Sequence, residues 1–319
     1  MESLLKNKIN NYTFEEVSDI YNSPFIELIL KAQDIHRIFH PPNKVQICTL
    51  SNIKSGNCPE DCKYCPQSAH YKTDIEKYNL LPKQDILEQA KRAKQNGASR
   101  FCMGAAWRSV PENEDFNKIL EIVNEVSKIG VEVCCTLGML TQEQAYKLKQ
   151  AGLTAYNHNL DTSEKFYKEI ITTRAYKDRL QTIKCVANAG IQVCSGGIIG
   201  LGEAKHDRIE LVKTLANLKP QPESVPINVL VKVKGTPLEN NMQIESLEIV
   251  RTIATSRILI SKAKVRLSAG RLEMSSELQA LCFLAGANSI FSGDKLLTTG
   301  NPEVNEDKEL FSKLGLEAL

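Results

Sequence analysis

The sequence predicts an α/β protein built as a (β/α)8 barrel of the TIM type, with an N-terminal helical extension. Eight segments rich in β-branched residues recur along the chain, and amphipathic helical stretches separate them. The 319 residues contain no low-complexity linker, and eight such units over roughly 250 residues suit this barrel. A doubly wound open sheet has the same alternation and is the alternative fold.

The elements follow in chain order. The first 40 residues contain two helical patterns, at 13–20 and 25–39, and we expect them to pack outside the barrel. This divides the chain into an extension over 1–40 and a barrel domain over 41–319. The predicted strands are 45–50, 99–104, 131–136, 154–160, 192–198, 225–231, 264–268 and 289–292.

Start and stop signals mark the helices between these strands. A helix over 82–96 would have Pro82 at its first position and Gly97 at its end. Apolar residues spaced three and four apart precede Gly130, which is typical of a helix covering a sheet. The last helix, over 303–314, should stop at Gly315.

Charge and hydropathy narrow the function classes. Lys and Arg number 40 against 38 Asp and Glu, without a basic tract, so nothing favours binding to nucleic acid or an anionic membrane. No apolar run approaches the roughly 20 residues that span a bilayer. Residues 1–8 lack the apolar stretch of a secretory signal, and we expect a cytoplasmic protein.

Ten cysteines are many for a chain in a reducing compartment, where they serve as buried apolar residues or metal ligands. Cys58, Cys62 and Cys65 have the spacing C-x3-C-x2-C in a loop rich in Gly and Pro. Three thiolates on a four-iron cluster leave one iron open to a small molecule. A zinc site completed by His70 is the alternative, and buried inert thiols are a third possibility.

A second set lies on the predicted strands. Side chains alternate along a strand, and Cys102, Cys134, Cys194 and Arg266 fall on four different strands. Each cysteine alone would usually be an inert core residue. A buried guanidinium, however, needs an anion, which a metal–sulfide cluster on three thiolates would supply. Cys135, Cys185 and Cys282 are assigned to packing, and the role of Cys48 stays open.

Longer motifs carry a family resemblance. C-x3-C-x2-C, with an aromatic Tyr64 before its last cysteine, resembles the radical S-adenosylmethionine superfamily. Residues 45–47, 51–56, 58–68, 101–108, 156–162, 194–197 and 265–271 resemble the biotin synthase family, a similarity that runs from about 41 to about 300. The resemblance implies a 4Fe–4S cluster on Cys58, Cys62 and Cys65, and a 5′-deoxyadenosyl radical formed from S-adenosylmethionine. It further implies a sulfur-donating 2Fe–2S cluster on Cys102, Cys134, Cys194 and Arg266.

The same resemblance implies the ligand contacts. Tyr64 is an implied cofactor contact, and Asn159 and Asp161 would hold the ribose of S-adenosylmethionine. Glu203 belongs to the stretch that would surround the adenine. The methionine carboxylate would pair with Arg179, which is preferred to Arg174. Asn159 and Asn228 would hold the ureido ring of dethiobiotin, and Thr298 and Thr299 its carboxylate. Asp161 could instead be a helix cap, and His158 is interpreted as structural.

The implied reaction is sulfur insertion into dethiobiotin to give biotin. Its implied partners are an external reductant such as flavodoxin or ferredoxin, iron–sulfur assembly proteins and a second copy in a homodimer. Two alternatives stay open. One is another radical enzyme with the same barrel and a different substrate. The other is a non-catalytic zinc or electron-transfer protein.

Overall fold

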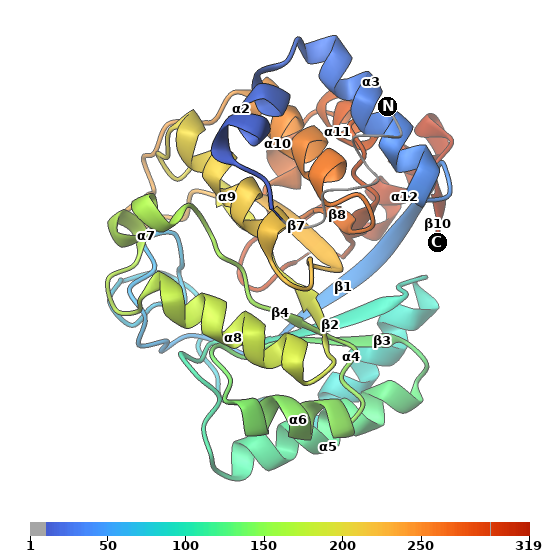
Figure 1. The fold of residues 1–319 in the computed structure, drawn as a ribbon. Coiled ribbons are helices and arrows are strands. Elements are labelled where there is room, and N and C mark those ends of the chain that lie inside the picture. Colours follow the sequence, from blue (N-terminus) through green and yellow to red (C-terminus); the bar gives the residue numbers. More distant parts are fainter. Residues whose placement is uncertain (1–10, 294) are drawn as a thin grey trace.

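The computed structural model describes residues 11–293 and 295–319, and in this part of the chain parallel strands close into a barrel (Figure 1). Hydrogen bonds join neighbouring strands in the order β1-β2-β3-β4-β5-β7-β8-β9, β6 continues alongside β7, and β9 pairs back with β1. This closure confirms the (β/α)8 barrel and excludes the open sheet. The strands are β1 (Lys44–Lys54), β2 (Arg100–Ala105), β3 (Glu132–Thr136), β4 (Ala155–Asn157), β5 (Gln192–Cys194), β6 (Gly197–Ile199), β7 (Ser224–Val229), β8 (Lys264–Leu267) and β9 (Ser289–Phe291).

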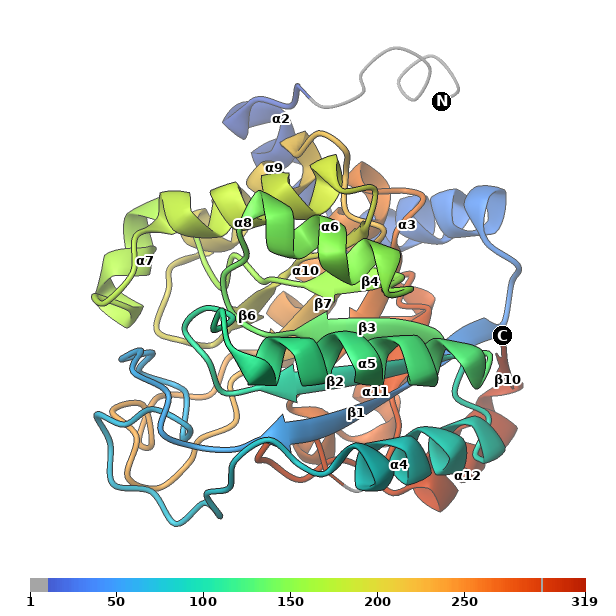
Figure 2. The same ribbon diagram turned by 90° about the horizontal axis from the view of Figure 1, so that it is seen from below.

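Helices surround the barrel, and in Figure 2 the strand arrows point toward long loops gathered at one end. A short strand, β10 (Glu317–Ala318), pairs with the beginning of β1, and a 3-10 turn covers Arg271–Glu273. No helix in the described residues is long and apolar enough to cross a membrane. The helices are α4 (Lys83–Gln95), α5 (Glu114–Lys128), α6 (Gln142–Gln150), α7 (Glu164–Ile170), α8 (Tyr176–Asn188), α9 (Lys205–Asn217), α10 (Ser246–Leu259), α11 (Ser276–Leu284) and α12 (Val304–Leu314).

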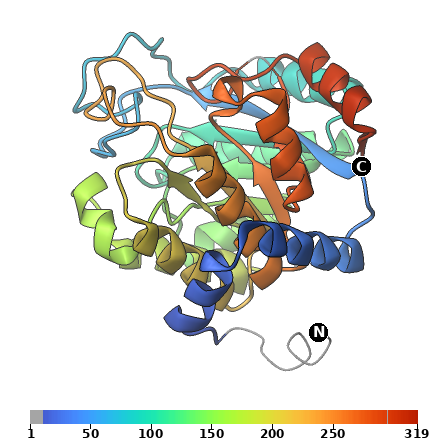
Figure 3. The ribbon, with the colours of Figure 1, turned by 90° about the horizontal axis from the view of Figure 1, so that it is seen from above.

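Two N-terminal helices, α2 (Phe14–Asn22) and α3 (Phe25–Phe39), pack against α9 and α10 on the outside of the barrel (Figure 3). Thr13 and Glu16 form a capping box at the start of α2. Residues 1–10 lie outside the described residues. They include residues 1–8, for which the sequence predicts no secretory signal. The division of the chain at residue 40 stays a prediction.

Three elements differ from the sequence prediction. Strand β4 ends at Asn157, so Asn159 and Asp161 lie beyond it, and Asp161 takes a left-handed φ of 68°. The predicted fifth strand divides into β5 and β6 around Gly196, where a Cβ would lie 1.9 Å from the carbonyl oxygen of Pro226. Helix α4 begins at Lys83, and Pro82 is its N-cap. The break at Gly196 arises from the close approach of the Pro226 backbone, which periodicity does not reveal.

Buried apolar residues form two separate layers. The larger core lies between the barrel and its helices and contains Cys135, Cys185 and Cys282, which confirms their assignment to packing. The smaller cluster lies inside the barrel, where TIM-type folds usually place Val, Ile and Leu. It comprises Cys48, Cys102, Cys134, Ala155, Phe291 and Leu296. The barrel interior is therefore lined with thiols.

Candidate active site

The loop between β1 and α4 carries Cys58, Cys62 and Cys65 at the carboxyl ends of the strands. Backbone hydrogen bonds hold its shape: the amide of Cys58 donates to the carbonyl of Gln67 at 2.9 Å, and that of Cys65 to the carbonyl of Cys62 at 2.9 Å. Gly56 has a φ of 75°, which allows the chain to turn sharply after the strand. The three cysteines thus sit on a fixed loop at the end of the barrel where such folds place their chemistry.

The cysteine loop is tied to the segment between α7 and α8. Asp61 accepts hydrogen bonds from the backbone amides of Thr172 at 2.9 Å and Thr173 at 3.2 Å. Burial raises the pKa of Asp61, but the hydrogen bonds from these two threonines outweigh it and lower the pKa to about 2. Asp61 is therefore an ionised anchor of the loop.

Burial governs the acidity of the loop thiols. It raises the pKa of Cys62, and it raises that of Cys65 to about 12, with the nearby charge of Cys58 adding to the effect on Cys65. Thiolates without a metal are therefore disfavoured at this site, because the nearby arginines and backbone amides offset only part of the cost of burying them. A cationic metal centre stabilises thiolates in such surroundings, so the donor set fits an iron–sulfur cluster.

His70 is poorly placed to complete a zinc site. Its Nε2 lies 3.1 Å from the carbonyl oxygen of Pro59, and the ring is exposed. Across residues 11–293 and 295–319, no three His, Cys, Asp or Glu side chains converge on the position of one metal ion. Cluster thiolates bind separate irons and need no such convergence. The geometry thus favours a cluster over the Cys3His alternative.

Tyr64, Asp161 and Arg179 form a connected group beside this loop. The Tyr64 hydroxyl donates to Asp161 Oδ2 at 2.8 Å, and Arg179 forms an ion pair with the same carboxylate. Arg179 also donates from Nη1 to the carbonyl of Asn159 at 2.7 Å. The N-cap of α7 is Ser163, not Asp161, so the alternative role of Asp161 as a helix cap is wrong. Its carboxylate is oriented by charge and hydrogen bonding instead.

A second guanidinium lies nearby. Arg174 is 9% exposed, and within the described residues its Nε has no hydrogen-bond partner. Its nearest carboxylate, that of Glu60, lies 4.0 Å away. An unsatisfied buried donor is costly, and an anionic ligand would satisfy it. Arg174 and Arg179 both line a cavity at this end of the barrel, and the Nε of Arg174 is the donor left without a partner among the described residues.

A cavity of about 300 Å³ opens at this end of the barrel, and we call it the central cavity. Its volume is at the lower end of the range for ligand pockets. It brings together residues from the cysteine loop and from the ends of β4, β7 and β9. The predicted site residues that line it are Cys58, Tyr64, Cys65, Asn159, Asp161, Arg179, Asn228, Thr298 and Thr299.

Glu203 lies apart from the lining of the central cavity. Its Oε1 accepts a hydrogen bond from the amide of Gly200 at 3.0 Å and pairs with Arg208 at 3.0 Å. Arg208 in turn pairs with Glu248 at 2.6 Å. The Glu203 carboxylate therefore holds the Gly-rich stretch in place through the amide of Gly200. Direct contact between Glu203 and the adenine stays a prediction.

Cys102, Cys134 and Cys194 meet inside the barrel, and together with Arg266 we call them the inner thiol site. Cys102 and Cys134 are register partners on β2 and β3, and all three thiols are at most 2% exposed. The thiols of Cys102 and Cys194 both lie close enough to Cys134 to influence its pKa. The neighbouring Cys102 side chain and burial raise the pKa of Cys134. These thiols also need a metal to become thiolates.

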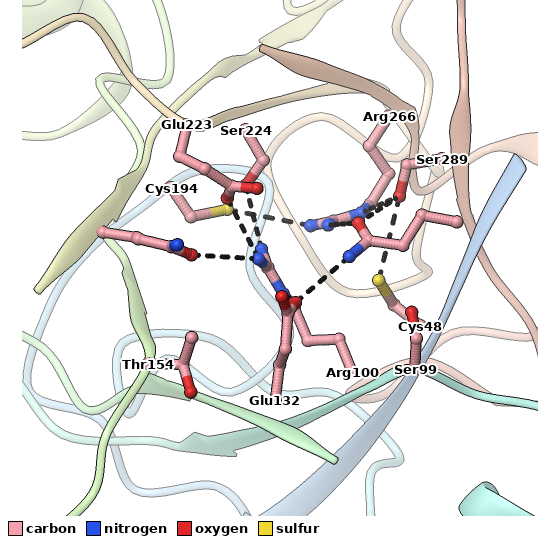
Figure 4. Close-up of polar contacts among 12 residues, drawn as sticks. Cys48, Ser99, Arg100, Glu132, Thr154, Cys194, Glu223, Ser224, Arg266 and Ser289 are labelled. Carbon is pink, nitrogen blue, oxygen red and sulfur yellow. Dashed lines mark hydrogen bonds and ion pairs between the residues drawn. The ribbon is translucent and has the colours of Figure 1, made fainter. Parts of the chain in front are cut away.

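Arg266 points into the same space (Figure 4). Its Nη1 lies 3.7 Å from Cys194 Sγ, its Nε donates to Ser289 Oγ at 2.9 Å, and its Nη2 donates to Gln46 Oε1 at 3.3 Å. Burial lowers the pKa of Arg266, but negative charge on the neighbouring sulfurs of Cys48 and Cys194 outweighs burial and raises it. A buried guanidinium that contacts a thiol and two neutral polar side chains fits the predicted set of three cysteines and one arginine.

Arg100 is a second buried arginine, which the sequence analysis missed. It is 0% exposed and pairs with Glu132 at 2.7 Å and Glu223 at 3.0 Å on the amino-terminal side of the barrel (Figure 4). The signal was available, because Arg100 precedes Cys102 by two residues and shares its inward face. Arg100 and its partners close the barrel below the inner thiol site.

The central cavity and the inner thiol site share a wall. Leu50, Leu296 and Ala269 line the cavity and also pack against the cluster that contains Cys102 and Cys134. Asn157, another lining residue, donates from Nδ2 to Cys194 Sγ at 3.3 Å and to Asn159 Oδ1 at 3.0 Å. The cavity thus lies between the cysteine loop and the inner thiols.

Comparisons with known proteins agree with this geometry. Residues 52–215 match the Radical SAM superfamily model, and residues 226–317 match the Biotin and Thiamin Synthesis associated domain. A biotin synthase of Cytophaga hutchinsonii is 60% identical over 97% of this chain and 91% of its own length. The chain belongs to the biotin synthase family. A biotin synthase of Coxiella burnetii is 56% identical over 97% of this chain and 96% of its own length.

Membership of the biotin synthase family establishes the enzyme class and the cofactors. The chain is a radical S-adenosylmethionine enzyme, and its cofactors are S-adenosylmethionine, a 4Fe–4S cluster and a 2Fe–2S cluster. Among solved structures, methylornithine synthase superposes with a TM-score of 0.82 at 16% identity, covering 100% of this chain and 96% of its own. That likeness supports the barrel fold alone.

Proposed function

We propose that this chain converts dethiobiotin to biotin in the central cavity, between an outer cluster on Cys58, Cys62 and Cys65 and the inner thiol site. The observation that carries the proposal is the shared wall of Leu50, Leu296 and Ala269, which separates the cavity from the inner thiols by single side chains. A substrate seated there has a radical source on one side and a sulfur source on the other.

The cofactor side of the cavity is polar. Asp161 and Asn159 face it with oxygen atoms suited to a ribose diol, and Tyr64 and Arg179 fix the Asp161 carboxylate. Arg179 binds the methionine carboxylate in this proposal, with the free Nε of Arg174 as a second donor. A bidentate guanidinium suits a carboxylate, and each such charged hydrogen bond contributes about 1.5–3 kcal/mol.

The substrate side combines amides and hydroxyls. Asn159 and Asn228 hold the neutral ureido ring, and Thr298 and Thr299 hold the substrate carboxylate. Asn228 is oriented by two backbone contacts, donating to the carbonyl of Gly197 at 3.0 Å and accepting from the amide of Ala269 at 3.2 Å. Preset donors and acceptors reduce the entropy lost when the substrate binds.

When bound, the outer cluster supplies the electron that splits S-adenosylmethionine into methionine and a 5′-deoxyadenosyl radical, and the inner cluster supplies the sulfur. The chain itself positions the reactants and excludes water. Leu296 is 7% exposed in the cavity wall, and it keeps the space above the inner thiols apolar. Protection of this kind is the protein's usual part in radical chemistry.

The wider setting belongs to the same proposal. The enzyme takes electrons from an external reductant such as flavodoxin or ferredoxin, receives its clusters from iron–sulfur assembly proteins, and acts in the cytoplasm as a homodimer.

Anaerobic reconstitution with iron and sulfide tests the function. The reconstituted chain should hold about six irons, four plus two. With S-adenosylmethionine, dethiobiotin and a reductant it should form biotin and 5′-deoxyadenosine, both measured by mass spectrometry. Deoxyadenosine without biotin from a six-iron chain would assign the fold to another substrate.

A further inference from the structure

Cys48 is a fourth thiol inside the barrel. It lies on β1, is 0% exposed, and packs in the same cluster as Cys102 and Cys134. Its neighbour Ile47 belongs instead to the outer core. Cys48 thus faces the inner thiol site, whereas Cys135, Cys185 and Cys282 belong to the core between barrel and helices.

One hydroxyl connects Cys48 to Arg266. Cys48 Sγ lies 3.7 Å from Ser289 Oγ, and this oxygen accepts a hydrogen bond from Arg266 Nε at 2.9 Å (Figure 4). Ser289 donates its own hydrogen to Gln46 Oε1 at 3.2 Å. The hydroxyl has one hydrogen, so the Cys48 thiol is the donor to Ser289. The thiol proton therefore points toward the group that holds the guanidinium.

We propose that Cys48 is a reserve ligand of the inner cluster, which replaces Arg266 when the guanidine leaves its iron. This inference rests on the proposed function, because it requires the 2Fe–2S cluster at the inner thiol site. Thiolate is the usual ligand of such clusters, and a guanidine is a weaker one. The reserve thiol would keep the cluster bound while the arginine is displaced.

The exchange balances without an outside reagent. The bond between iron and the neutral guanidine nitrogen breaks, and a bond between iron and Cys48 sulfur forms. The thiol proton passes to the departing guanidine, which becomes a guanidinium, so the charge of the site is unchanged. No electron is transferred. Ser289, in contact with both groups, is the path for the proton.

The two ligand states should differ in reduction potential. A nitrogen ligand in place of a thiolate raises the potential of a 2Fe–2S cluster, as in Rieske centres. The Cys48-bound state should therefore have the lower potential. This difference gives a readout that does not depend on biotin formation.

The test compares Arg266→Ala with the double variant Arg266→Ala/Cys48→Ala after anaerobic reconstitution. Arg266→Ala should retain about six irons and show an inner cluster with a lower midpoint potential than the parent chain. The double variant should retain about four irons. Arg266→Ala/Cys282→Ala is the matched control, since Cys282 is an equally buried thiol in the outer core, and it should behave like Arg266→Ala.

Equal iron content in Arg266→Ala and the double variant would overturn the inference. So would an unchanged potential in Arg266→Ala. If circular dichroism shows that the double variant does not fold, Arg266→Ala/Cys48→Ser replaces it, because serine preserves size and hydrogen bonding and should also lose the inner irons. A parent chain with only four irons would overturn the inner site of the proposed function, and this inference with it.

Discussion

Asn157 donates a hydrogen bond from Nδ2 to the Sγ of Cys194 at 3.3 Å. The contact joins the central cavity to the inner thiol site, because Asn157 also donates to Asn159, which lines the cavity. Thr136 donates to Asn157 Oδ1 at 3.2 Å and so fixes the orientation of the amide. Asn157 therefore connects a ligand-binding residue to a cluster cysteine.

Removing this amide should change the inner cluster. Hydrogen bonds to cluster sulfurs raise the reduction potential, so Asn157→Ala should lower the midpoint potential of the inner cluster while six irons remain bound. Spectroelectrochemistry of the reconstituted chain measures it. Asn188→Ala, which removes a hydrogen bond to Gln142 on the exterior, is the control. An unchanged potential in Asn157→Ala would contradict this role.

The two cysteine sets should fail in different ways. Cys62→Ala should lose the outer cluster and abolish S-adenosylmethionine cleavage, because two thiolates leave a second iron unligated. Cys194→Ala should retain about four irons and cleave S-adenosylmethionine, yet form no biotin. Iron analysis and 5′-deoxyadenosine assays distinguish them, with Cys185→Ala as a packing control. Normal biotin formation by Cys194→Ala without added sulfur would refute the donor assignment.

The contributions of Arg179 and Arg174 to S-adenosylmethionine binding can be ranked by the affinities of two variants. Arg179→Lys retains the charge beside Asp161 but loses the planar fork, so the affinity for S-adenosylmethionine should fall by about tenfold to a hundredfold, as expected for a charged hydrogen bond of about 1.5–3 kcal/mol. Arg174→Lys should weaken it less. Equilibrium binding to the reconstituted chain measures both. A larger loss in Arg174→Lys would transfer the carboxylate contact to Arg174.

Stability should fall in acid through His36 and His40. Burial and then the charge of Arg257 lower the pKa of His36 to about 3 and that of His40 to about 4. Both imidazoles are neutral when folded, whereas the unfolded chain protonates them near pH 6.5. Their contribution is therefore complete above pH 6.5. It is lost as the pH falls from 6.5 to about 4 for His40 and to about 3 for His36, by up to about 1.4 kcal/mol per pH unit for each.

Urea unfolding between pH 4.5 and 7.5 tests this dependence. His36→Leu should flatten the slope of unfolding free energy against pH over that window relative to the parent chain. His206→Gln, at an exposed position on α9, should leave the slope unchanged. An identical slope in His36→Leu and the parent would mean that the pKa of His36 is the same in the folded and the unfolded chain.

Much of the secondary structure could be predicted from local sequence patterns. The eight predicted strands correspond to the strands of the barrel, since alternation and start and stop residues depend on neighbours in the chain. The interruption at Gly196 escaped prediction, because it arises from the backbone of Pro226, distant in sequence. Arg100 was missed although its spacing from Cys102 places it on the inward face, and only its carboxylate partners, Glu132 on β3 and Glu223 just before β7, required the tertiary structure.

The sequence by itself determined the alternating β and α units, the C-x3-C-x2-C loop and the strand positions of Cys102, Cys134, Cys194 and Arg266, because spacing and strand alternation are local properties of the chain. Only the tertiary structure decided which groups meet. It placed Cys48 beside Ser289 and Arg266, took Asp161 away from the helix cap, and set the cavity directly above the inner thiols. Such contacts depend on barrel closure, which fixes the register between strands distant in sequence.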